Sequence, residues 1–359
     1  MSEDLWPFPS HRLPAAAGGE PDPPIDVICL GNALADMLAF ASVAEIEAAG
    51  LTLGAMTLVD GARAAELDGA ATEWRLVAGG SAANTAAGLA SLGGRCAFVG
   101  AVGPDPAGAS YAKDLEGIGV ECYLAESPDA PTGVCHVFVT PDGQRSMATS
   151  LGAAGELTAT AVERAGLHRA AVLYVEGYLL DAPPAKAALA RALELAAGAG
   201  TAVALSLSDP FVVERHHDRI AELVFGGAVQ LMLGNEEETL ALTGATSFEA
   251  AGAALRRPGL AGIITRGAAG AVAVLPGGDI AVPAYEVPKV EDTTGAGDLF
   301  AAGCLFAVTH GGGPEQALRL GAFAAAEVIA HLGARPNVRL AEAAPPGTLD
   351  LPGTLDLPF

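Results

Sequence analysis

Basic side chains are scarce in this chain of 359 residues. Lys and Arg number 19 against 42 Asp and Glu, which gives a formal net charge of −23. A surface with this charge repels phosphate backbones and anionic lipid headgroups, so nucleic acids and membrane surfaces are excluded as main partners. One pocket can still bind an anionic group if it supplies backbone amides and a few arginines, because net charge does not describe a single site.

The sequence also lacks paired cysteines, a secretion signal and long apolar runs. Its five cysteines contain no C-x-x-C pair, and several lie in apolar segments where a free thiol behaves as a small hydrophobic group. The first residues, MSEDLWPFPSHRLP, are acidic and interrupted by proline, unlike a signal peptide. No apolar stretch is long enough to span a bilayer. We therefore expect a cytoplasmic protein with no membrane partner.

Two nucleotide-binding motifs are absent as well. The chain contains neither G-x-x-x-x-G-K-[ST] nor G-x-G-x-x-G. This weakens the case for a P-loop enzyme and for a Rossmann dinucleotide site.

Apolar segments of strand length are abundant, and hydrophobic residues make up 51% of the chain. They alternate with segments of helical period such as AKAALARALELAAGAG, residues 185–200. This alternation predicts an α/β fold with a central, mostly parallel sheet flanked by helices on both faces. The predicted strands are IDVICLG, CAFVGAVG, AVLYVEG, AVALSLS, VQLMLGN, GIITRG and AVAVL.

One region departs from this pattern. Residues 132–154 alternate with period two around a Pro-Asp-Gly turn, which predicts an antiparallel hairpin. We expect a small β-sheet lid built mainly from about 36–60 and 120–152, within a main domain of 25–340. The proline-rich residues 1–24 are predicted to be a disordered lead-in, and residues 341–359, which repeat GTLDLP, a flexible or surface-bound tail.

The stretch DTTGAGDLF, residues 292–300, places an acid at the start of an apolar helix. The helical period begins directly after Asp298, and HGGG at 310–313 ends it. The first-turn amides of Gly295, Ala296 and Gly297 have no intrahelical acceptors, so they can hold an anion beside the carboxylate. Phosphoryl transfer needs such donors and a base. The alternative is an acid that only stabilises the helix dipole.

A second glycine-rich stretch, AGGSAANTAAGLASLGG, covers residues 78–94. Gly80 precedes Ser81, which we expect to be the N-cap, and Asn84 falls in the first turn. These polar groups suit the hydroxyls of a sugar, although a closely packed Ala/Gly helix explains the same residues. Upstream, GNALADML places Asp36 beyond the first strand, where ligands of open α/β sheets bind.

Two further stretches fit a nucleotide and its metal. TRGAAG, with Thr265, Gly267 and Gly270, joins two strands. Its glycines could let backbone amides contact phosphates, and the alternative is a plain hairpin turn. GNEEE supplies Asn235 and Glu238, which either interact with the helix dipole or hold a water shell around Mg²⁺. The HHD stretch at 216–218 is expected at the surface.

In their order and spacing, GGSAANTAAGLASLGG and DTTGAGDLFAAG resemble the two signatures of the PfkB/ribokinase family of sugar and nucleoside kinases. NEEE is similar to the family's N-x-x-E element, and TRGAAG to its T-x-G-x-x-G nucleotide loop. The resemblance spans about residues 25–340. It implies a ribokinase-like fold with ATP and Mg²⁺ as cofactors, Asp298 as catalytic base and the amides of 295–297 as an anion hole.

Within the family, the adenosine kinases are the most similar branch. GNALADM, QRSMATSLGAAGEL, YVEGYLL and LSLSDPF all resemble their segments. The resemblance implies that Arg145 reaches the transferred phosphoryl group, and the alternative for Arg145 is a solvent-facing turn residue. It also implies a ribose site of Asp36, Gly80, Ser81 and Asn84 and a base pocket of Met147, Thr149, Leu151 and Phe211.

Two features extend or qualify the resemblance. Glu176 stands where mammalian-type adenosine kinases resemble one another in having a small residue, so the base pocket is expected to differ. HLGARPN, residues 331–337, is similar to the family's C-terminal loop, which implies a monovalent cation such as K⁺ near Asp292, Thr294 and Asn337.

The resemblance implies transfer of the γ-phosphoryl group of ATP to the 5′-hydroxyl of adenosine, giving AMP. A sugar kinase of the same fold, acting on ribose, fructose or a related sugar, is the first alternative. A non-catalytic nucleoside sensor is the second, and the presence of every proposed catalytic residue argues against it. Both a monomer and a homodimer are compatible with the sequence.

Overall fold

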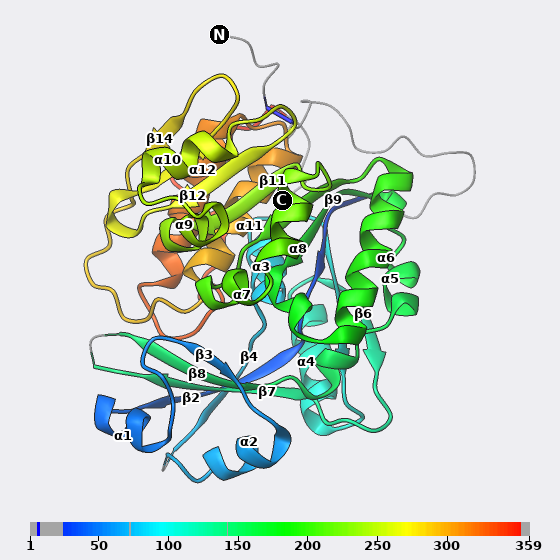
Figure 1. The fold of residues 1–359 in the computed structure, drawn as a ribbon, viewed down its shortest axis with the longest axis vertical. Coiled ribbons are helices and arrows are strands. Elements are labelled where there is room, and N and C mark those ends of the chain that lie inside the picture. Colours follow the sequence, from blue (N-terminus) through cyan, green and yellow to red (C-terminus); the bar gives the residue numbers. More distant parts are fainter. Residues whose placement is uncertain (1–5, 8–23, 72, 142, 353–359) are drawn as a thin grey trace.

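The computed structural model describes residues 6–7, 24–71, 73–141 and 143–352. Its elements form two sheets of unequal size (Figure 1). Most of the predicted lead-in and the second GTLDLP copy lie outside the described residues. Trp6, within that lead-in, packs against the main core, and Leu351 of the first GTLDLP copy is buried in it. Trp6 and Leu351 are thus both in contact with the main core.

The large sheet has nine strands in the order β14-β13-β12-β11-β10-β9-β1-β5-β6. All neighbours from β6 to β12 pair in parallel, whereas β12, β13 and β14 pair antiparallel. The predicted parallel sheet is thus confirmed, with an antiparallel edge. Its strands are β1 (Ile25–Leu30), β5 (Cys96–Val102), β6 (Glu121–Glu126), β9 (Ala170–Glu176), β10 (Ala202–Ser206), β11 (Leu231–Asn235), β12 (Ala261–Thr265), β13 (Ala271–Val274) and β14 (Ile280–Val282).

Both faces of the large sheet are buried, as its apolar strands predict. Along β1, Val27 and Cys29 belong to one apolar cluster, and Ile28 and Leu30 belong to the other. Successive strand side chains point to opposite faces, so each face needs its own layer of helices. The first cluster is covered by α3 (Ser81–Ser91), α4 (Pro106–Gly117), α11 (Ala296–Thr309), α12 (Pro314–Val328) and α13 (Leu340–Ala343). The second is covered by α5 (Ala159–Ala165), α6 (Pro183–Ala199), α7 (Pro210–Arg215), α8 (His217–Phe225), α9 (Glu236–Thr243) and α10 (Phe248–Leu255).

The small sheet has five strands in the order β3-β8-β7-β2-β4. These are β2 (Leu34–Phe40), β3 (Met56–Leu58), β4 (Arg75–Ala78), β7 (Gly133–Val139) and β8 (Arg145–Ser150). β7 and β8 form the predicted antiparallel hairpin. Helices α1 (Val43–Ala48) and α2 (Gly61–Leu67) lie on the side of this sheet away from the large one (Figure 1).

The expected limits of the lid need two changes. β6, which falls within 120–152, pairs with β5 and so belongs to the large sheet. β4, which falls outside both expected ranges, pairs with β2 at the edge of the small sheet. β6 is joined to its partner β5 through α4, and β4 is separated from its partner β2 by β3 and two helices, and local periodicity does not identify which strands pair.

Candidate active site

A cavity of about 910 Å³ opens between the two sheets. Asn32 follows β1, Glu176 ends β9, Ser206 ends β10, and Asn235 and Thr265 end β11 and β12, and all five line it. The cavity therefore lies at the carboxyl ends of the parallel strands, where open α/β sheets bind ligands. The small sheet supplies the opposite wall.

Helix α11 begins at the floor of this cavity. Gly295 is its N-cap and has a φ of +76°, and a Cβ there would lie 2.5 Å from the carbonyl oxygen of Ala334. This position therefore needs glycine for both conformation and space. At Gly297, by contrast, a Cβ would meet nothing within 4 Å. The mouth of the helix is open to the cavity rather than filled by side chains.

The predicted anion-holding amides are not equivalent. The amide of Ala296 donates to the carbonyl of Thr293 at 3.3 Å, so it already has an internal partner. Within the described residues, no such bond is found for the amides of Gly295, Gly297 and Asp298. The first-turn amides of a helix attract anions for this reason.

Asp298 is held by the start of α3. Ser81 Oγ donates to its Oδ1 at 2.6 Å, and Asn84 Nδ2 donates to its Oδ2 at 3.0 Å. Thr85 Oγ1 also donates to the main-chain carbonyl of Asp298 at 3.1 Å. The prediction that Ser81 caps α3 is wrong, because Gly80 is the N-cap and the Ser81 hydroxyl is directed to Asp298.

The charge of Asp298 is set by opposing effects. Burial raises the pKa of its carboxyl above the usual range, while the hydrogen bonds from Ser81 and Asn84 and the charge of Arg145 lower that pKa. Arg145, at the start of β8, lines the cavity half-buried and has no ion-pair partner among the described residues. Its role toward a phosphoryl group stays a prediction, with which its place in the cavity lining is compatible.

Two further buried carboxyls line the cavity. Burial raises the pKa of Asp36 to about 7, although the charges of Arg335 and Arg145 oppose this rise. Burial also raises the pKa of Glu176 to about 7, against the hydrogen bonds that it accepts from backbone amides. Glu176 Oε1 accepts from the amide of Asn32 and its Oε2 from the amide of Ala82, both at 2.8 Å. Glu176 thus joins the end of β1 to the start of α3.

Three of the four residues predicted to form the nucleobase pocket share one wall of the cavity. Met147, Thr149 and Leu151 point into it at alternate positions of β8 and just beyond, as the period of two requires. Phe211 faces them from α7 and is 43% exposed.

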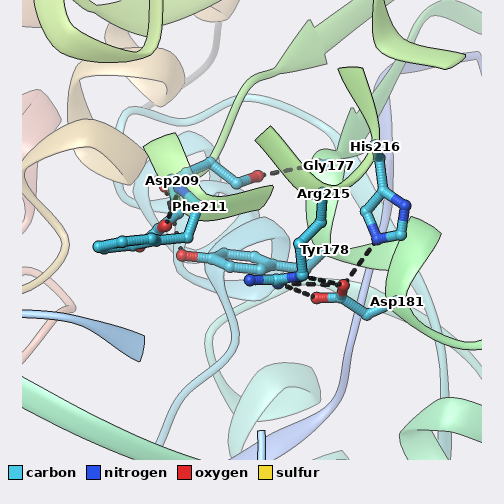
Figure 2. A network of polar contacts seen from close by, with 8 residues as sticks. Gly177, Tyr178, Asp181, Asp209, Phe211, Arg215 and His216 are labelled. Carbon is cyan, nitrogen blue, oxygen red and sulfur yellow. Dashed lines mark hydrogen bonds and ion pairs between the residues drawn. The ribbon is translucent and has the colours of Figure 1, made fainter. Parts of the chain in front are cut away.

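Polar contacts behind Phe211 fix the position of α7. Figure 2 shows the Asp181 carboxylate meeting both Arg215 and His216 at the end of that helix. The Arg215 Nη2 atom donates to both Asp181 oxygens, at 3.0 and 2.9 Å. Asp209 Oδ1 accepts from the Phe211 amide at 2.7 Å, and Tyr178 donates to the carbonyl of Ser208 at 3.2 Å. His217 and Asp218, the rest of the HHD stretch, are exposed as expected.

Most, but not all, of the residues expected to bind nucleotide and metal line the cavity. Asn235 and Glu238 both line the cavity, but they also bond to each other in a capping box at the start of α9. Burial raises the pKa of Glu238 to about 7. Thr265 and Gly267 line the cavity, whereas Gly270 does not. Gly270 has a structural reason to be glycine, since a Cβ would lie 2.1 Å from the carbonyl oxygen of Val282.

The predicted monovalent-cation residues are not gathered in one place. Asp292 is fully buried and accepts from the amide and hydroxyl of Thr294 and, at 3.0 Å, from the amide of Gly333. Asn337 is exposed, and its backbone amide donates to the Glu327 carboxylate. The loop thus reaches Asp292 through Gly333 rather than Asn337. A cation site here stays a prediction.

Acids dominate the lining of the cavity. Among the described residues that line it, Arg145 is the only lysine or arginine, against seven carboxyl groups, those of Asp36, Glu176, Asp181, Asp209, Glu237, Glu238 and Asp298. A polyphosphate therefore needs a cation to enter without strong repulsion. In the described part of the chain, no three His, Cys, Asp or Glu side chains form a ready metal cluster. The donor set suits Mg²⁺, which keeps several waters and takes only one or two carboxylates from a protein.

Comparison with known proteins identifies the family to which this chain belongs. The model of the pfkB family carbohydrate kinases matches residues 43–340. The chain belongs to the pfkB family. It is a phosphotransferase with an alcohol group as acceptor, and ATP as phosphoryl donor follows from the family.

Three similar proteins show how far the likeness extends. The structure of adenosine kinase from Sinorhizobium meliloti is 40% identical, with a TM-score of 0.87 over 89% of this chain and 98% of that chain. A probable sugar kinase from Rhizobium etli CFN 42 is 36% identical, with a TM-score of 0.87 over 90% and 98%. Adenosine kinase 1 of Arabidopsis thaliana is 28% identical over 280 residues, which are 72% of this chain and 79% of that protein.

Sequence reasoning missed several contacts of this pfkB-family site. Glu176 was noted only as a departure, yet its two amide contacts brace the start of α3. Asp181 was not singled out, although it lines the cavity and anchors α7. Arg335 was seen only as part of a loop, but its Nε donates to Asn84 Oδ1 at 3.3 Å. Each depends on contacts across more than 30 residues, for which the local sequence carries no signal.

Proposed function

We propose that this pfkB-family enzyme transfers the γ-phosphoryl group of ATP to the 5′-hydroxyl of adenosine, giving ADP and AMP. The observation that carries the proposal is the position of Asp298. It lies at an open helix mouth, beside unpaired amides and within the influence of Arg145, in a cavity that can hold both substrates. The volume lies in the range of small-molecule sites.

The roles of the residues follow from their chemistry. The Asp298 carboxylate accepts the proton of the 5′-hydroxyl as that oxygen bonds to the γ-phosphorus, and the bond from phosphorus to the β-phosphate oxygen breaks to release ADP. The amides of Gly295, Gly297 and Asp298 and the guanidinium of Arg145 stabilise the charge on the phosphoryl oxygens. Ala296 contributes less, because its amide is partly occupied by Thr293.

Substrate binding divides between the two sheets. We propose that Asp36, Ser81 and Asn84 hold the ribose hydroxyls, beside the Gly80 turn. The adenine ring lies between Phe211 on one side and Met147, Thr149 and Leu151 on the other. The side chains of these last three form a mainly apolar wall. Thr265, Gly267 and Asn235 face the nucleotide. Mg²⁺, held through water by Glu238, would neutralise phosphate charge. Closure of the small sheet would exclude water and suppress ATP hydrolysis.

The alternative acceptor is a sugar, since the similar Rhizobium etli protein is described as a probable sugar kinase. The two proposals differ at the apolar wall, because a purine would cover this wall, whereas a free pentose or hexose would leave it exposed to water. The family match and the free thiols of the described residues fit a cytoplasmic enzyme.

A panel assay distinguishes the acceptors. ADP release is measured with adenosine, inosine, ribose and fructose at equal concentrations. The proposal predicts the highest kcat/KM for adenosine and a specific loss of that preference in Phe211→Ala. A higher kcat/KM for ribose or fructose, unaffected by Phe211→Ala, would replace adenosine by a sugar. Arg256→Gln, which removes an exposed ion pair with Asp279, is the matched surface control.

A further inference from the structure

A chain of polar contacts leads from outside the cavity to the proposed base. Arg335 Nε donates to Asn84 Oδ1 at 3.3 Å, and Asn84 Nδ2 donates to Asp298 Oδ2 at 3.0 Å. Arginine has only donors, and an ionised carboxylate has only acceptors. The amide between them can satisfy both neighbours in one orientation only, with its oxygen toward Arg335 and its nitrogen toward Asp298.

Arg335 itself does not line the cavity. Its guanidinium contacts the Asp114 carboxylate on α4 and lies 5.9 Å from the centre of the Tyr111 ring. The side chain is only 16% exposed. It is therefore held from behind α3, and it can act on the reaction only through another residue.

The loop that carries Arg335 also touches the mouth of α11. The amide of Gly333 donates to Asp292 Oδ2 at 3.0 Å, and the backbone of Ala334 lies against Gly295. The same three residues thus contact the turn before α11 and the first turn of α3. The two helix starts that meet at Asp298 share one brace.

We infer that Arg335 is a positioning residue for phosphoryl transfer. By donating to Asn84 Oδ1, it fixes the amide so that its nitrogen faces Asp298, which keeps the carboxylate oriented toward the acceptor hydroxyl. Without Arg335 the amide is free to turn, and its oxygen can then face the carboxylate and repel it. The inference rests on the proposed role of Asp298 as base.

A structural role predicts something different. If Arg335 only ties its loop to α4 through Asp114, its loss should lower stability and disturb substrate affinity. Removal of the Asp114 charge should then be as harmful as removal of Arg335. If Arg335 acts through Asn84, its loss should lower kcat, and any change in KM should be no larger than that of Asn84→Ala, because Asn84 is also proposed to hold the ribose. Both effects should then depend on Asn84 being present.

The test is a double-mutant cycle on the full chain. Arg335→Met, Asn84→Ala and the double variant are compared for kcat, for KM of adenosine and for thermal unfolding. We expect Arg335→Met to lower kcat about tenfold or more, and the double variant to be no slower than Asn84→Ala, because coupled residues are non-additive. Asp114→Asn should lose much less kcat than Arg335→Met. Arg335→Lys, which keeps a cationic donor, should recover part of the loss.

Two outcomes would overturn the inference. One is additive losses of kcat in the cycle, and the other is an Asp114→Asn defect equal to that of Arg335→Met. If Arg335→Met does not fold, the cycle is run with Arg335→Gln, which removes the charge but keeps a polar side chain. Failure of the inference is separable from failure of the proposed function, because Asp298→Asn is measured alongside. If Asp298→Asn retains full activity, the base assignment itself is wrong.

Discussion

At the scale of single residues, Asp298 has two opposing requirements. A general base must be ionised in the free enzyme, yet its pKa should lie near the working pH to drive proton transfer. Burial raises its pKa, and the two hydrogen bonds and Arg145 limit the rise. The donors and the nearby positive charge thus favour the ionised carboxylate that a general base needs.

The pH dependence of kcat/KM tests this balance. Because the base works only when ionised, activity should fall as the pH drops through the raised pKa of Asp298. Arg145→Met removes a charge that lowers this pKa, so the acidic limb should move to higher pH. The measurement is kcat/KM for adenosine from pH 5 to pH 9, with Arg256→Gln as control. An acidic limb that does not move in Arg145→Met would show that Arg145 does not act on the base.

Glu176 offers a test of stability. A glutamine there can accept from only one of the two amides, so its NH₂ group would face a backbone donor. Leaving a buried donor unsatisfied costs about 1–3 kcal/mol, and we expect Glu176→Gln to lower the free energy of unfolding by that amount. Denaturant unfolding with matched slopes measures it. A variant as stable as the parent would mean that the two contacts contribute little.

The raised pKa of Glu176 also predicts how the stability difference between the parent and Glu176→Gln changes with pH. The folded pKa of Glu176 is raised to about 7, so the folded state binds more protons than the unfolded state below that pH. This stabilising contribution is full at low pH and is lost as the pH rises through about 7. The stability difference between parent and Glu176→Gln should therefore shrink from pH 5 to pH 8.

At the scale of elements, the start of α11 combines a tight position with an open one. Gly295 lies against the carbonyl of Ala334, while Gly297 faces empty space in the cavity. Two glycines two residues apart in the sequence thus have different reasons to be glycine. One allows the loop and helix to pack, and the other leaves room for a ligand.

Alanine substitutions should separate these two roles. Gly297→Ala should leave the unfolding temperature near that of the parent but reduce turnover, because its methyl group enters the space above the amides. Gly295→Ala should lower both, since its methyl would collide with Ala334 and φ is positive. Thermal unfolding and kcat of the two variants provide the comparison. Full activity in Gly297→Ala would show that no ligand atom approaches this amide.

The elements also show what the sequence can and cannot reveal. Seven strands of the large sheet and the β7–β8 hairpin follow from local periodicity, which reports one chain segment at a time, whereas β6 and β14 are not among the predicted strands. Placing β6 in the large sheet and β4 in the small one requires knowledge of remote partners. Ser81 looked like a cap because serine often caps helices, but a contact across 217 residues takes its hydroxyl to Asp298. Gly270 looked functional, yet the packing of β14 explains it.

At the scale of the whole molecule, the site exists only because two sheets face each other. The large sheet supplies Asp298, Glu238 and the strand ends, and the small sheet supplies Asp36, Arg145 and the apolar wall. The carboxyl groups of the described lining lie mainly on the large-sheet side, to which the small sheet adds only Asp36, in a chain whose net charge is −23. Among the described residues, no helix is both long and apolar enough to cross a membrane.

This charge distribution predicts that the affinity for ATP depends on a divalent cation. ATP affinity measured by calorimetry should fall at least about tenfold when Mg²⁺ is replaced by EDTA, because like charges at short range then oppose each other without compensation. Adenosine carries no charge, so its affinity is the internal control and should change little. Equal ATP affinity with and without Mg²⁺ would show that the acidic lining does not face the phosphates.

The role of Asp298 as base is tested most directly by Asp298→Asn. We expect kcat for adenosine phosphorylation to fall about 10²–10⁴-fold, the usual contribution of a general base. The Kd for adenosine, measured by calorimetry, should remain close to that of the parent, and Asp279→Asn should retain parental activity. An Asp298→Asn enzyme that turns over adenosine at the parental rate would contradict the account.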